Sequence, residues 1–165
     1  MLIPTRKLLA HARRDTYAVG AFNVYNLEGA LAVTRAAEEL KSPVILQVLP
    51  SAIEIVGTAL VKLCLEAGKS AAVPVSVHLD HCSSPDLMHL ALSAGVSSVM
   101  ADGSMHDHDT NIRFTRQMVQ LAETFTADVE AELGCIQGEE DGLDFGGRSE
   151  KMTDPASAVD FVEKT

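Results

Sequence analysis

The stretch VPVSVHLDHCSSPDLMHLALSAGVSSVMADGS (73–104) contains the pattern that decides the fold of this protein. Two runs of β-forming residues, over 73–79 and 96–102, enclose a segment with the composition and spacing of one helix. Ser84 is placed to cap the start of this helix, and Gly95 is placed to end it. A strand, a helix and a second strand in this order make up the basic unit of a parallel sheet.

The same alternation of strand and helix extends along the whole chain of 165 residues. The predicted strands cover 17–24, 42–49, 73–79, 96–102 and 126–133. Their nearly continuous apolar and β-branched composition is typical of strands that are covered on both faces. The predicted helices cover 5–14, 27–41, 51–70, 84–95, 109–125 and 154–165.

Strict alternation of strands and helices predicts a parallel sheet with right-handed crossovers, either an open doubly wound sheet or a (β/α)₈ barrel. No GxGxxG or GxxxxGK[ST] motif follows any predicted strand, which disfavours a nucleotide-binding open sheet. The helix predicted before the first strand fits the floor of a barrel. We therefore expect an α/β protein of the (β/α)₈ TIM-barrel type, incomplete here, with about five βα units in one partial domain over 1–165.

The net charge of −10 argues against nucleic acid and against an anionic membrane surface as partners, because both require clustered Lys and Arg. No apolar run approaches the ~18 residues of a membrane-spanning helix. The three cysteines are scattered and have no CxxC spacing, which favours a reducing compartment and hence a cytoplasmic location.

Polar residues gather where the predicted strands end. They are Asn23, Asp80, His81, Asp102, Glu130 and Glu132. The carboxyl ends of barrel strands meet at one rim, which carries the catalytic groups of such enzymes. A single Asp at a strand end often only caps the next turn, and Asp102 before Gly103 and Ser104 could have that role. An imidazole with several carboxylates on successive strands instead suits a divalent cation, with zinc the expected ion.

Strand geometry raises one difficulty for this interpretation. Successive side chains of a strand point to opposite faces, so Asp80 and His81 reach one site only if the strand curls at its end. His78 lies two residues before Asp80 on the same face, and we expect it to be a hydrogen-bonded structural residue.

Four segments carry a resemblance to a known family. VHLDHC, SVMADGS, VEAELG followed by GEEDG, and GAFNVYNLE resemble the class II, zinc-dependent fructose-bisphosphate aldolases and their tagatose-bisphosphate relatives. The resemblance covers essentially the whole chain, but only about the N-terminal five-eighths of the family's barrel. It implies a reaction of glycolysis: reversible aldol cleavage of a ketose 1,6-bisphosphate to dihydroxyacetone phosphate and glyceraldehyde 3-phosphate, through a zinc-stabilised enediolate.

The resemblance also implies roles for individual residues. His81 matches a zinc ligand, while Asp102 and Glu132 match carboxylates that hold the metal in an alternative position. Asp80 matches the acid/base that exchanges a proton with the C4 hydroxyl of the substrate. Glu140 matches the base that moves the proton on the triose carbon.

Further implications concern substrate, ions and assembly. Asn23 matches a residue near the substrate, and Ser51 could replace a polar group that relatives carry at the position of Leu49. The expected cofactor is Zn²⁺, with a possible second divalent ion and a monovalent cation. The expected partners are a phosphorylated sugar and further copies of the chain in a dimer or tetramer.

In the family, the sixth and seventh barrel strands supply two more zinc histidines, and the 165 residues are expected to end before them. We therefore expect a fragment or truncated gene product with weak zinc binding and little turnover. The alternatives are a non-catalytic aldolase-like binding or assembly module and a different metal-dependent barrel lyase or hydrolase. A lysine Schiff base is disfavoured, because no lysine lies at a predicted strand end.

Overall fold

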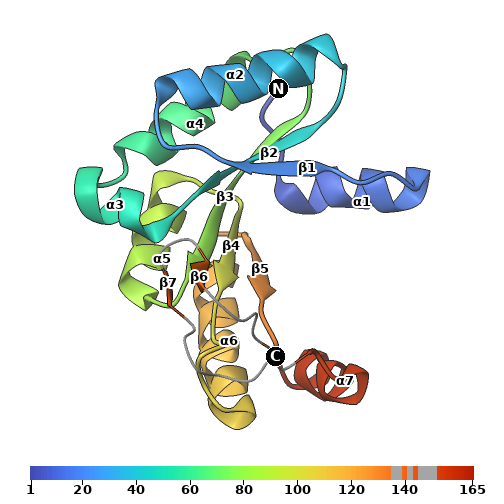
Figure 1. Ribbon diagram of the computed structural model, residues 1–165, viewed down its shortest axis with the longest axis vertical. Helices are drawn as coiled ribbons and strands as arrows, with labels where there is room; N and C mark the ends of the chain where they lie inside the picture. The colour runs from blue at the N-terminus through green and yellow to red at the C-terminus, as the bar shows by residue number, and fades with distance from the viewer. Residues whose placement is uncertain (135–138, 141–142, 145–151) are drawn as a thin grey trace.

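A computed structural model describes residues 1–134, 139–140, 143–144 and 152–165 (Figure 1). Five parallel strands form one sheet in the order β1-β2-β3-β4-β5. Their bounds are β1 Gly20–Asn23, β2 Val44–Val48, β3 Val75–Cys82, β4 Ser98–Ala101 and β5 Asp128–Ala131. Two short strands, β6 Glu139–Glu140 and β7 Leu143–Asp144, pair with each other in a separate antiparallel hairpin.

Helices alternate with the five strands. They are α1 Thr5–Asp15, α2 Leu27–Glu39, α3 Pro50–Val56, α4 Ala59–Ser70, α5 Pro85–Ala94, α6 His108–Glu123 and α7 Pro155–Lys164. The cap expected at Ser84 is present, and the structure shows the same kind of cap at Asn26 and Asp154: each side chain accepts a backbone hydrogen bond at the start of its helix, α5, α2 or α7. Gly95 ends α5 with φ 112°. Of the described helices, none is long and apolar enough to cross a membrane.

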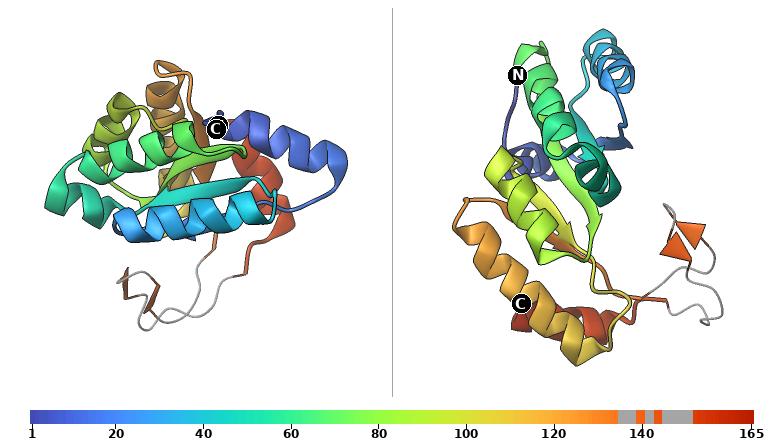
Figure 2. Two further views of the ribbon diagram at one scale, coloured as in Figure 1. Left: turned by 90° about the horizontal axis from the view of Figure 1, so that it is seen from above. Right: turned by 90° about the vertical axis from the view of Figure 1, so that its left-hand side faces the viewer.

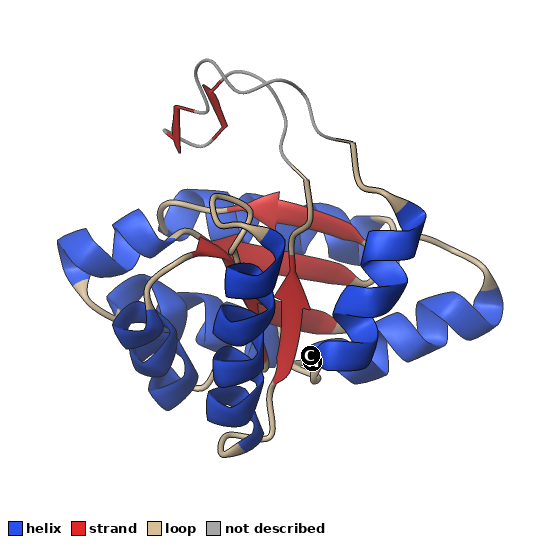
Figure 3. Cartoon of the chain, turned by 90° about the horizontal axis from the view of Figure 1, so that it is seen from below, coloured by secondary structure: helices blue, strands red, loops and turns tan. Residues whose placement is uncertain are grey.

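Spatial order equals chain order in this sheet, as Figure 3 shows with the strands side by side and the helices around them. A doubly wound sheet would reverse the order at a switch point, so the incomplete barrel predicted from the sequence is confirmed. The main apolar core lies between the sheet and the helices that connect its strands, and Figure 2 shows α4, α5 and α6 along one face.

The other face of the sheet is more polar, and α1 begins at its lower end. Adjacent positions in the strand register bring Asn23, Gln47, His78, Ser98 and Asp128 into one row across the sheet. Below this row, the Thr5 hydroxyl at the start of α1 bonds to the hydroxyls of three serines, Ser76, Ser97 and Ser98. These bonds place α1 at the amino ends of β3 and β4, the position expected for a barrel floor.

Several predicted boundaries differ from those of the structure. The single helix expected over 51–70 is two helices, because Gly57 adopts φ 61° and ψ −146°, a conformation that ends α3 before α4 begins. The strand expected to end at residue 79 continues to Cys82, so Asp80 and His81 lie within β3 and not after it. The helix expected from residue 109 begins one residue earlier and is capped by Asp107.

Candidate metal centre and acid–base site

The end of β3 is bent at His81. This residue adopts φ 43°, a left-handed conformation that is uncommon for any residue other than glycine, and the register between β3 and β4 shifts between Leu79 and Cys82. Such a bulge re-aims a side chain that regular alternation would send to the opposite face. Beyond it, the Asp102 amide donates to the Cys82 carbonyl at 3.0 Å. The strand therefore has the bend that Asp80 and His81 need in order to reach the same site.

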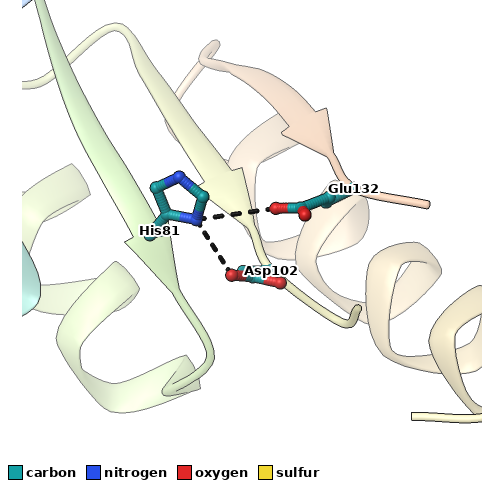
Figure 4. Close-up of side chains that lie close together, drawn as sticks. All are labelled: His81, Asp102 and Glu132. Atoms are coloured by element: carbon teal, nitrogen blue, oxygen red, sulfur yellow. Dashed lines mark hydrogen bonds and ion pairs between the residues drawn. The ribbon is translucent and has the colours of Figure 1, made fainter. Parts of the chain in front are cut away.

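Three side chains from successive strand ends meet in front of this bulge, as Figure 4 shows. Nδ1 of His81 lies 3.0 Å from Oδ2 of Asp102 and 3.5 Å from Oε2 of Glu132. One ligand atom from each residue falls within 4.8 Å of the other two. The side chains of His81 and Asp102 are only 15% and 5% exposed, so the cluster lies in a largely desolvated position.

The side chains of the cluster stabilise each other's charged forms. The hydrogen bond to Asp102 raises the pKa of His81 to about 9, against the opposing effect of burial and with help from the charges of the neighbouring carboxylates. Burial alone would raise the pKa of Asp102, but hydrogen bonds from His81 and Ser104 outweigh it and lower that pKa. Without a metal ion, the His81 ring is therefore a cation at neutral pH and is paired with the ionised Asp102.

The sequence left open whether Asp102 caps a turn or faces the candidate metal site, and in the structure it does both. Its Oδ1 accepts hydrogen bonds from the Ser104 amide at 3.0 Å and the Ser104 hydroxyl at 2.7 Å, which stabilise the turn after β4. Its Oδ2 faces His81. The turn therefore holds the carboxylate in the orientation that brings it into the cluster.

Asp80 lies beside the cluster and is held from another strand. It is 6% exposed, and its Oδ2 accepts a hydrogen bond from Nδ2 of Asn23 at 2.9 Å. Asn23 is the last residue of β1, two strands away in the sheet. The structure thus brings together a residue expected near the substrate and the residue expected to move a proton.

His78 is buried one layer below. Its Nδ1 lies 2.7 Å from the Ser98 hydroxyl, which confirms the expected hydrogen bond. Burial lowers the pKa of His78 to about 4, so the ring is neutral at physiological pH. Its Nε2 is 3.6 Å from Oε2 of Glu130, beyond hydrogen-bond range, and no other hydrogen-bond partner for this atom lies among the described residues. His78 is therefore part of the wall below the site.

Two expected site residues are less well defined. Ser51 is the second residue of α3, directly after β2, and it is exposed at the strand-end rim. Glu140 lies in β6, and its side chain is outside the described part of the structure. The roles expected for both residues stay predictions.

Sequence reasoning missed Asn111, a buried residue of α6. Its Nδ2 donates to the backbone carbonyl of Glu132 at 2.8 Å, and its side chain is in contact with the turn at Gly103. A signal was present in the sequence, because Asn111 shares the buried stripe of α6 with Thr115, Met118 and Ala122 at helical spacing. A polar residue on such a stripe indicates a specific buried partner.

The donor set fits a borderline divalent metal. One imidazole and two carboxylates provide nitrogen and oxygen ligands, and their present mutual contacts show that they can approach a common point. His108, by contrast, pairs with Asp160 at 3.1 Å, and among the described residues only His81, Asp102 and Glu132 form a group of possible ligands.

A partial (β/α) barrel with an imidazole and carboxylates at the carboxyl ends of its strands has the architecture of metal-dependent barrel enzymes. Comparison with known families identifies which one. Residues 3–165 match the family described as "Fructose-bisphosphate aldolase class-II", and the chain belongs to this family of lyases.

Individual relatives agree with this assignment. The chain is 41% identical over 165 residues to the fructose-bisphosphate aldolase of Thermus caldophilus, covering 100% of this chain and 54% of the relative. A Coccidioides immitis crystal structure provisionally assigned as a fructose-1,6-bisphosphate aldolase is similar with a TM-score of 0.91 and 37% identity, covering 97% of this chain and 57% of the other. The crystal structure of the YdjI aldolase of Escherichia coli K12 is similar with a TM-score of 0.84 and 33% identity, covering 100% of this chain and 58% of the other. The chain therefore spans about half the length of its relatives.

Proposed function

We propose that this chain carries part of the active site of a class II aldolase, which reversibly cleaves a ketose 1,6-bisphosphate to dihydroxyacetone phosphate and glyceraldehyde 3-phosphate. The observation that carries the proposal is the meeting of His81, Asp102 and Glu132 at one point beside the buried Asp80. Family membership supports the reaction type. The proposed location is the cytoplasm, and the proposed assembly is a dimer or tetramer.

His81, Asp102 and Glu132 would hold the metal ion, for which zinc is proposed because the set mixes nitrogen and oxygen donors. Bound there, zinc would supply Lewis-acid stabilisation of negative charge that develops on substrate oxygens. The hydrogen bond to Asp102 stabilises the protonated His81 ring, so a metal ion that binds this ring must displace its proton. Zinc affinity should therefore increase with pH up to about 9.

Asp80 is the proposed acid/base for the C4 hydroxyl. The Asn23 amide donates to one of its oxygens and so restrains the carboxylate, and a proton-transfer group must be held in position. Asn23, the last residue of β1, is proposed to lie near the substrate. Glu140 is proposed as the second base, acting on the triose carbon.

The metal site can be tested with the 165-residue chain. We expect calorimetric titration with zinc to show one site, and His81→Ala to lower its affinity at least tenfold, because loss of a residue that only supports a ligand already costs ~10- to 100-fold. His11→Ala, on α1, is the matched control and should leave the affinity unchanged. Equal zinc affinities for wild type and His81→Ala would contradict the proposed ligand.

The reaction requires a longer protein, because relatives are about twice this length. We expect little turnover by the chain alone in a coupled aldol-cleavage assay. Joined to the part of the Thermus caldophilus aldolase that it does not cover, the chain should be active, and Asp80→Ala should abolish that activity while zinc stays bound. Robust turnover by the 165 residues alone would show that the ligands have been misplaced.

A further inference from the structure

We propose that Asn111 is a positioning residue that fixes two of the three groups of the candidate metal centre, Asp102 and Glu132. The inference rests on the proposed function, since it concerns the same site. Asn111 lies in the first turn of α6, and its side chain makes contacts with the backbone beside both carboxylates. Both of these contacts are with the backbone, so the proposed action of Asn111 on the two carboxylates is through the backbone.

The contact with Glu132 is a hydrogen bond. Nδ2 of Asn111 donates to the Glu132 carbonyl at 2.8 Å, at the first residue after β5 ends. The strand ladder ends at Ala131, so this bond from α6 continues the restraint on the chain by one residue. A fixed backbone at Glu132 in turn limits where its carboxylate can reach.

The contact with the Asp102 turn is steric. A Cβ atom at Gly103 would lie 2.1 Å from Oδ1 of Asn111 and 2.6 Å from its Cγ. The backbone of Gly103 therefore packs directly against the amide, at a distance that only glycine permits. Because Gly103 follows Asp102, the amide forms a wall behind the turn that holds this carboxylate.

The amide itself is held in one orientation. Asn111 is 2% exposed, and the Thr115 hydroxyl, one helical turn later, donates to its Oδ1 at 3.1 Å. Since Oδ1 accepts this bond, Nδ2 is the end that faces the Glu132 carbonyl. Leucine at position 111 would have a similar size, but it would leave both the carbonyl and the hydroxyl without this partner.

Two variants disrupt the contacts of Asn111, one at Asn111 itself and one at Gly103, and a third variant serves as control. Asn111→Leu removes both hydrogen bonds, and Gly103→Ala pushes a methyl group into the amide. Met118→Ala also opens a buried position of α6, two helical turns away from Asn111. All three are expected to lower the free energy of unfolding, so urea denaturation is used to correct the other measurements for global stability.

The first measurement needs no metal. The Ser104 amide is bonded to Asp102, and the His106 amide is bonded to the Gly103 carbonyl at 2.9 Å. We expect hydrogen exchange at both amides to be at least tenfold faster in Asn111→Leu and Gly103→Ala than in Met118→Ala, after correction for global stability. Protection equal to that of Met118→Ala would overturn the proposal.

The second measurement is zinc affinity by calorimetric titration. Asn111→Leu and Gly103→Ala should each bind zinc at least tenfold more weakly, and Met118→Ala should stay within twofold of wild type. Wild-type affinity in Asn111→Leu would overturn the proposal. If the wild-type chain binds no zinc, the proposed metal centre fails by itself, and the exchange measurement still decides whether Asn111 holds the turn after Asp102.

Discussion

At the residue scale, the position of His81 in the site requires a strained backbone conformation. A non-glycine residue with φ 43° at the end of a strand costs on the order of 1–3 kcal/mol. The surroundings maintain it, since Asp102 and Glu132 face the ring and the Asp102 amide is bonded to the adjacent Cys82. Strain that persists in this way is typical of functional residues.

The first prediction concerns pH. The pKa of His81 is about 9 in the folded chain against 6.5 in the reference state, because the folded chain stabilises the protonated ring. This stabilisation is complete below pH 6.5 and is lost as pH rises through about 9. We expect the free energy of unfolding, measured with urea in the presence of a chelator, to fall by up to about 3 kcal/mol over this range relative to His81→Asn. Identical profiles for the two proteins would contradict the described pairing.

The second prediction concerns the hydroxyl network beneath His78. Ser98→Ala removes a hydroxyl that bonds both Nδ1 of His78 and the hydroxyl of Thr5, all three residues being buried. We expect a loss of about 1–3 kcal/mol in urea denaturation, because two buried polar groups lose a partner. Ser93→Ala, at an exposed position of α5, should change the stability by less than about 0.5 kcal/mol. A loss at Ser98 no larger than at Ser93 would argue against the network.

At the element scale, the positions of α3 and α4 depend on one glycine. Apolar residues continue through 51–70 at helical spacing, yet Gly57 ends α3 with φ 61° and the chain resumes in α4 at Ala59. This break separates the short α3, which follows β2 and carries Ser51, from α4. Apolar spacing alone would favour one continuous helix.

The third prediction tests this break. A Cβ at residue 57 would meet no atom within 4 Å, so any cost of Gly57→Ala must come from the backbone conformation. We expect a loss of about 1–3 kcal/mol in thermal or urea unfolding. Lys62→Ala, at an exposed position within α4, is the control and should be nearly neutral. A neutral Gly57→Ala would mean that the positive φ is not required.

At the scale of the whole molecule, the sheet has two open edges. Neither β1 nor β5 has a second neighbour in the described sheet, and the residues of β1 are largely exposed, with Phe22 51% exposed. Unpaired strand edges favour association with other chains. The net charge of −10 opposes this association by mutual repulsion, most strongly at low ionic strength.

The fourth prediction follows for the 165-residue chain. Light scattering should detect dimers or larger species as concentration rises, and more of them at high salt, which screens the charge. Ala21→Lys on β1 should reduce this association, because charged edge residues disfavour strand pairing. A monodisperse monomer at all concentrations and salt conditions would show that the edges are protected.

Much of the architecture could be predicted from local patterns. The alternation of strands and helices, the cap at Ser84 and the stop at Gly95 depend on residues within a few positions of one another. The motifs at the strand ends also indicated which side chains would converge. The continuous helix over 51–70 was the main failure, since the apolar spacing concealed the break at Gly57.

The sequence by itself thus determined the units, their order and the residue types at the rim. Only the tertiary structure decided how these residues meet: the bulge at His81, the shared turn and site roles of Asp102, and the contact of Asn111 with Glu132. The physical reason is how far apart along the chain the interacting residues are. Caps and periodicity arise from neighbours along the chain, whereas the bulge and the buried amide depend on contacts between residues about twenty positions apart, which exist only after the strands have packed side by side.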